Sequence, residues 1–89
     1  MDQYFNKGLN MIVKVLGSGC TKCELLKQRL VDLKDKHQLD IEIEKVTQLN
    51  DIMKYGILMT PGLVINEKVM SSGKIPHDEE ILKWIQEEK

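Results

Sequence analysis

Two cysteines stand at the point where an apolar run changes into a helical pattern. The run Met11–Leu16 ends in Gly17-Ser18-Gly19, and Cys20-Thr21-Lys22-Cys23 opens the helical pattern. Because glycine permits a sharp turn, the helix that follows directs its free N–H groups and the positive end of its dipole at Cys20. A thiolate at Cys20 is stabilised there, and Cys23 on the same helical face can attack a disulfide formed at Cys20. The pattern predicts dithiol chemistry.

The length and charge of the chain limit its size to one domain and restrict the partners it can bind. The chain has 89 residues, and its 13 basic and 14 acidic side chains are interspersed, with a formal charge of −1. We expect one small domain, a monomer, with no nucleic-acid or membrane partner. Residues 1–10 lack the apolar centre of a signal peptide, and no apolar run is long enough to span a bilayer. We therefore expect a cytoplasmic protein, in whose reducing compartment paired cysteines are more often catalytic or metal-binding than structural.

The first half of the chain predicts strand, helix and strand. Met11–Leu16 is nearly all apolar, which is typical of a central strand, and its exception Lys14 is expected to extend its ammonium group to the sheet edge. Leucines recur at helical spacing over residues 21–36. Residues 39–44 alternate apolar and acidic side chains, as an edge strand does. Residues 1–10 show no period, so we expect a flexible extension there and a domain at 11–89.

The second half predicts a short helix and then a hairpin. Thr47 is the expected N-cap of a helix at 48–55, which Gly56 ends. Strands are expected at 63–65 and 68–70, joined by a tight turn at Asn66-Glu67.

A last helix is expected to begin with Pro76 at its first position. Acidic residues fill its opening turn, and it directs Ile81, Leu82 and Ile85 inward, with Trp84 beside them. The resulting order is βαβαββα. The opening βαβ unit requires a parallel pair of strands, and the hairpin adds antiparallel strands. The fold class is therefore α/β, a mixed four-stranded sheet flanked by helices.

Metal sites use the same cysteine spacing. A closed zinc site needs four ligands, and the chain offers Cys20, Cys23, His37 and His77. We expect His37 near the end of the first helix and His77 at an exposed helix start, so these histidines should not converge on the thiols. Clusters held by four thiolates of one chain are excluded by the number of cysteines. No resident metal or other cofactor is predicted.

A family resemblance follows from three features taken together. The sequence Gly17-Ser-Gly-Cys-Thr-Lys-Cys23, the Thr60-Pro61 pair ahead of a hairpin, and the closing helix resemble the thioredoxin superfamily over about residues 11–89. Within it, the chain is most similar to small prokaryotic thioredoxin-like redox-active disulfide proteins with Gly-x-Gly-Cys-x-x-Cys. The resemblance implies a thioredoxin-like fold with Cys20 as nucleophile and Cys23 as resolving cysteine. It also implies that Pro61 is a cis-proline, and that Thr60 lends its backbone to the substrate.

The chain departs from familiar members of that superfamily at several positions. Gly19 stands where thioredoxins have Trp, and Thr21-Lys22 stands where they have Gly-Pro. Residues 71–76 do not match the glutathione element of glutaredoxins. Lys14 occupies the place of the buried Asp that moves protons for the resolving thiol, which leaves the proton acceptor of Cys23 unassigned.

We predict a thiol–disulfide oxidoreductase that acts on disulfide-containing proteins and receives electrons from a separate reductase or a small thiol. Lys22 and Gly19 are candidates for supporting the Cys20 thiolate, although Lys22 is as readily explained as a solvated helix residue. The alternative is a Cu(I)-binding module or chaperone, which would use the same cysteines. Such modules carry Met where this chain has Ser18, and their order is βαββαβ. A third possibility is a binding module without enzymatic activity.

Several larger side chains are assigned to packing. The methionines Met53, Met59 and Met70 are expected to fill the core, although Met59 is near enough to Pro61 to line a substrate groove. Tyr55 and Trp84 are also expected to pack rather than react.

Overall fold

A computed structural model describes residues 11–18 and 21–88 of the chain. The expected extension at 1–10, and Gly19 and Cys20, lie outside the described residues. The elements follow the predicted order βαβαββα. They are β2 (Met11–Leu16), α1 (Thr21–His37), β3 (Ile41–Val46), α2 (Leu49–Met53), β4 (Gly62–Ile65), β5 (Lys68–Ser72) and α3 (Asp78–Glu87).

The strands form a mixed four-stranded sheet in the order β3-β2-β4-β5. β2 pairs with β3 in parallel and with β4 antiparallel, and β4 and β5 form an antiparallel hairpin with a bulge between Leu63 and Val64. The nearly continuous apolar sequence of β2 fits its central place, because both faces of such a strand are covered. The predicted α/β architecture is confirmed, with β3 as an edge strand.

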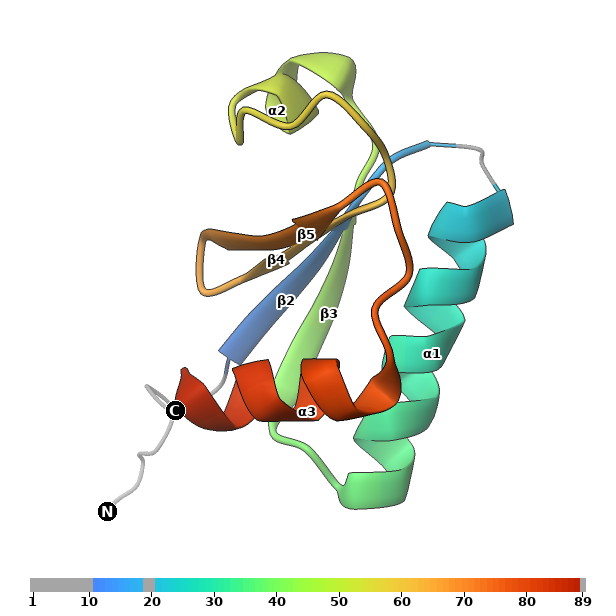
Figure 1. The fold of residues 1–89 in the computed structure, drawn as a ribbon, viewed down its shortest axis with the longest axis vertical. Coiled ribbons are helices and arrows are strands. Elements are labelled where there is room, and N and C mark those ends of the chain that lie inside the picture. Colours follow the sequence, from blue (N-terminus) through green and yellow to red (C-terminus); the bar gives the residue numbers. More distant parts are fainter. Residues whose placement is uncertain (1–10, 19–20, 89) are drawn as a thin grey trace.

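Helices α1 and α3 lie along the sheet, and the short α2 lies near the end of the sheet at which β3 ends (Figure 1). On one face, α1 and α3 pack against alternate residues of β2 and β4 around the larger core, whose buried members include Val13, Leu30, Leu63 and Ile81. On the other face, α2 contributes Ile52 to a smaller core. This arrangement leaves the carboxyl end of β2 and the start of β4 at the same end of the sheet, because the two strands are antiparallel and Leu16 pairs with Gly62.

Two elements, β3 and α2, begin later than predicted. Gln38 adopts a positive φ of 51°, and the Leu39 N–H donates to the Lys34 carbonyl oxygen at 3.0 Å. The residues between His37 and Ile41 therefore form the end of α1 and the connection to β3, which begins at Ile41 rather than at residue 39. α2 begins at Leu49 after Gln48, whose side chain makes no capping hydrogen bond, so the prediction of Thr47 as N-cap is wrong. α2 ends at Met53 rather than Tyr55.

The hairpin turn is confirmed at Asn66-Glu67, where φ is 52° and 67°. Two successive positive φ values match the twist of the flanking strands in a two-residue turn. β5 extends to Ser72, beyond the predicted end at Met70.

Pro76 is not the first residue of the last helix. His77 is the N-cap of α3, and the Glu80 carboxylate accepts a hydrogen bond from the His77 backbone N–H at 3.2 Å. The helix therefore begins two residues later than predicted, at Asp78, because Glu80 reaches back to the backbone of the residue after the proline. Pro76 instead packs in the interior, where its side chain is fully buried.

Candidate functional site

Cys23 lies in the first turns of α1 and is completely buried. It is not a free cysteine in the structure. Its predicted partner in exchange, Cys20, and the candidate support Gly19 lie outside the described residues, so their roles remain predictions. The side chain of Lys22 is exposed.

Thr60 and Pro61 lie at the end of the loop that leads into β4. Their peptide bond is cis, as predicted. Pro61 is fully buried, and its carbonyl oxygen accepts a hydrogen bond from the Gly73 N–H at 2.9 Å. The loop is thereby fixed to the residue that follows β5.

Gly17 brings Cys23 and Thr60 together. A Cβ atom placed on Gly17 would overlap the Cys23 Sγ, and it would lie 3.2 Å from the Thr60 Cβ. The glycine has φ +148° and donates its N–H to the Val46 carbonyl oxygen at 2.9 Å. The end of β2, the start of α1 and the loop before β4 therefore meet at one point, and they can do so because Gly17 has no side chain. The sequence indicated Gly17 only as a turn residue.

Lys14 forms a hydrogen-bonded cluster on the other side of β2. Its Nζ donates to the Tyr55 hydroxyl oxygen at 2.8 Å and to the Glu67 carboxylate at 2.7 Å, and the Tyr55 hydroxyl donates to the second Glu67 oxygen at 2.7 Å. The Lys14 side chain is only 18% exposed. The prediction that its ammonium group reaches the sheet edge is wrong. The group lies between Tyr55 and the hairpin turn.

The hydrogen bonds of this cluster determine whether Lys14 can accept a proton from Cys23. The Glu67 carboxylate and then the Tyr55 hydroxyl raise the pKa of Lys14 well above its ordinary value. The hydrogen bond from Lys14, followed by that from Tyr55, lowers the pKa of Glu67. Lys14 therefore stays protonated and cannot accept a proton from the resolving thiol.

The prediction of Met53 and Met59 as core residues is wrong. Both are exposed, whereas Met70 is partly buried against the larger core. Met59 lies over Gly73, where an added Cβ would be 3.1 Å from the Met59 Cβ and 3.3 Å from its Cε. Its neighbour Leu58 is 99% exposed. The sequence did not single out Leu58, because an apolar run such as Ile57-Leu58-Met59 normally indicates burial.

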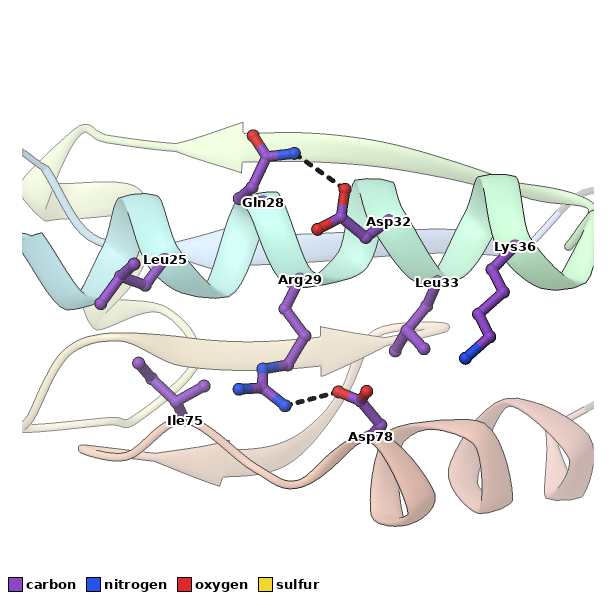
Figure 2. Close-up of a pocket in the computed structure, with 8 residues that line it drawn as sticks. All are labelled: Leu25, Gln28, Arg29, Asp32, Leu33, Lys36, Ile75 and Asp78. Atoms are coloured by element: carbon purple, nitrogen blue, oxygen red, sulfur yellow. Dashed lines mark hydrogen bonds and ion pairs between the residues drawn. The ribbon is translucent and has the colours of Figure 1, made fainter.

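A groove of about 460 Å³ runs along the outer side of α1, between this helix and the segment that leads into α3 (Figure 2). Leu25 lies at one end of the groove and is exposed. The other leucines of the predicted helix face are buried, namely Leu26, Leu30 and Leu33. Arg29 and Asp78 form an ion pair of 2.5 Å across the groove. This ion pair links α1 to the first turn of α3.

The histidines lie at helix ends. His37 is the last residue of α1 and His77 the N-cap of α3, and both are exposed. Within residues 11–18 and 21–88, no group of three or more His, Cys, Asp and Glu side chains is placed to hold a metal ion. No helix in the same part of the chain has the length and apolar character needed to cross a membrane.

The strand order, the two helical layers and the cis-proline beside the cysteine-bearing helix define a thioredoxin-like domain. The family described as thioredoxin domain matches residues 11–86, so the chain belongs to this family.

Relatives and solved structures agree with this assignment. The chain is 32% identical to a thioredoxin of Methanocaldococcus jannaschii, across 80% of this chain and 81% of that protein. It is 27% identical to a thioredoxin of Methanothermobacter thermautotrophicus, across 82% and 95%. The crystal structure of Fasciola hepatica thioredoxin has the same fold, with a TM-score of 0.64 at 19% identity, covering 90% of this chain and 82% of that one.

Proposed function

We propose that this protein is a thiol–disulfide oxidoreductase that reacts through Cys20 and Cys23. The observation that supports the proposal is the close packing at Gly17, because the Cys23 Sγ and the Thr60 Cβ both lie near the position that a Gly17 Cβ would occupy, and Pro61 follows Thr60. Membership of the thioredoxin family and the names of the archaeal relatives support a redox function.

The exchange takes place in two steps. The Cys20 thiolate attacks one sulfur of a substrate disulfide, forms a mixed disulfide, and releases the other substrate sulfur as a thiolate. The Cys23 thiol then loses its proton, attacks the Cys20 sulfur and releases the second substrate thiolate, so the substrate gains two electrons and the protein gains a Cys20–Cys23 disulfide. Since Lys14 is already protonated, water or a departing substrate thiolate takes the proton from Cys23.

Return to the dithiol form requires an electron donor from outside the chain. We propose a separate disulfide reductase or a small thiol in this role, and no bound cofactor enters either step. We also propose that the protein works as a monomer in the cytoplasm. The competing Cu(I) module is not favoured, since α2 lies between β3 and β4, where the βαββαβ order has consecutive strands.

Single-cysteine variants test the order of attack. Cys23→Ser should accumulate a mixed disulfide with a disulfide-containing protein such as insulin, because the first attack survives while the resolving thiol is lost. Cys20→Ser should trap little, and the variant without either cysteine provides the background on a non-reducing gel. Equal trapping by the two single variants would contradict the assigned roles. Tight Cu(I) binding without disulfide reduction would favour the metal-binding alternative.

A further inference from the structure

The cluster of Lys14, Tyr55 and Glu67 joins the segment before β4 to the turn after it. Tyr55 immediately precedes residues 56–61, which lead into β4, and Glu67 lies in the turn between β4 and β5. The Tyr55 hydroxyl donates to a Glu67 carboxylate oxygen at 2.7 Å, although the two residues lie 12 positions apart in the sequence. Residues 56–61 are therefore held at their start by this hydrogen bond and at their end by the fully buried Pro61.

Lys14 connects this segment to the central strand. Its Nζ donates to both Tyr55 and Glu67, and it lies 5.5 Å from the centre of the Tyr55 ring. Gly17 follows Lys14 by three residues, and a Cβ on Gly17 would lie 3.2 Å from the Thr60 Cβ. The chain that carries Lys14 into the cluster thus also carries the glycine against which Thr60 packs.

The backbone of Glu67 indicates that its side chain has a purpose beyond the turn. Glu67 has a φ of 67° and is the second of two successive residues with positive φ. Turns of this kind favour glycine at such positions, because a side chain is costly in the left-handed region. The Glu67 side chain is 65% exposed, so burial does not account for a glutamate there. What glutamate supplies and glycine does not is the hydrogen bonding to Lys14 and Tyr55.

The cluster is strong where packing is weak. The Lys14 ammonium and the Glu67 carboxylate make charge-assisted hydrogen bonds, which are stronger than neutral ones. The Lys14 side chain is only 18% exposed, so salt screens it less than a charge on the open surface. Within residues 56–61, by contrast, the side chains of Leu58 and Met59 are exposed. The cluster therefore supplies support that these two side chains do not.

We propose that Lys14, Tyr55 and Glu67 are positioning residues for disulfide exchange, whose cluster holds residues 56–61 so that the Thr60 backbone stays at the proposed site. This inference rests on the proposed function and deepens it. Lys14 acts here as a fixed hydrogen-bond donor, and no proton of the exchange passes through it.

Tyr55→Phe and Lys14→Met test the proposal because they weaken the cluster without altering the cysteines. A misplacement of about 1 Å can slow a reaction about a hundredfold, so the smaller shift expected here should lower the second-order rate constant for insulin reduction by the pre-reduced protein about tenfold. Alkylation of Cys20 by iodoacetamide should keep its wild-type rate, since this small reagent needs no contact with Thr60. Lys14→Arg retains a charged donor and should restore most of the exchange rate.

Two further variants separate positioning from stability. Glu67→Gly removes the carboxylate but places glycine where the positive φ favours it, so it should be more stable than Glu67→Gln and yet slow exchange as Tyr55→Phe does. Glu88→Gln is the matched control. It weakens the ion pair of 3.2 Å that joins Lys68 of the same hairpin to the end of α3, and it should leave exchange unchanged. Urea denaturation measures the stability of each variant.

The outcomes separate this inference from the proposed function. Wild-type exchange rates in Tyr55→Phe or Glu67→Gly, or an equal loss in Glu88→Gln, would overturn the positioning role and leave the oxidoreductase activity in place. A parallel loss of Cys20 alkylation, or a loss of exchange that simply follows the free energy of unfolding across the variants, would also overturn it. A wild type that reduces no insulin would overturn the proposed function and this inference together.

Discussion

Gly17→Ala is the substitution that most directly tests the convergence of the candidate site. The added Cβ would overlap the Cys23 Sγ and lie 3.2 Å from the Thr60 Cβ. Both neighbours are held in place, since Cys23 belongs to α1 and Thr60 precedes the buried Pro61. The methyl group can therefore be accommodated only if the backbone of one of these segments moves.

The expected cost has two parts. The backbone of Gly17 has φ +148°, and a residue with a side chain in so sparsely populated a conformation costs about 1–3 kcal/mol. Forcing a methyl group into a filled interior costs about a further 1–3 kcal/mol. We expect Gly17→Ala to lower the free energy of unfolding by about 2–6 kcal/mol, a large part of the roughly 5–15 kcal/mol available to a small domain.

Gly56→Ala is the matched control. Gly56 also has a positive φ, of 76°, but a Cβ there would have no atom within 4 Å. Its cost is therefore confined to the backbone, about 1–2 kcal/mol. Urea denaturation of both variants under identical redox conditions measures the difference as a shift of the midpoint at constant m-value.

The comparison with Gly56 makes the result decisive. If Gly17→Ala is no more destabilising than Gly56→Ala, the close approach of Cys23 and Thr60 to Gly17 is refuted. If it is more destabilising but trapping of mixed disulfides by Cys23→Ser is unaffected in the same background, the contact stabilises the fold without serving exchange.

Two further predictions concern polar side chains away from the cysteines. The Ser71 hydroxyl is buried without a hydrogen-bond partner in the part of the chain that the structure describes, so Ser71→Ala should raise the free energy of unfolding by about 1 kcal/mol; a lower Tm would contradict this. Glu67→Gln should be less stable than the wild type at neutral pH, because Lys14 and Tyr55 lower the pKa of Glu67 below its ordinary 4.5. Stability from a lowered pKa is present above 4.5 and is lost as the pH falls through the folded-state value, so urea midpoints of the two proteins should converge in acid. A difference that is constant across this range would exclude the carboxylate charge as its cause.

Local patterns in the sequence determined most of the secondary structure. The apolar run Met11–Leu16 and the leucine spacing of the first helix depend on neighbours within one or two turns, and both elements form as predicted. The turn at Asn66-Glu67 is equally local, because the two residues themselves must adopt positive φ. The cis bond at Thr60-Pro61 was predicted from these two residues and their place ahead of the hairpin, together with the family resemblance.

The tertiary structure decided which side chains meet and which are exposed. In the sequence, Tyr55 and Glu67 lie 41 and 53 residues from Lys14, yet the three side chains form one hydrogen-bonded cluster. No periodicity of the sequence extends over such separations. Leu58 faces solvent although its sequence is apolar, because the buried anchors Ile57 and Pro61 leave it at the outside of an arch. Local sequence specifies backbone conformation through nearby steric preferences, whereas the exposure of a loop side chain depends on where the packed core holds the two ends of that loop.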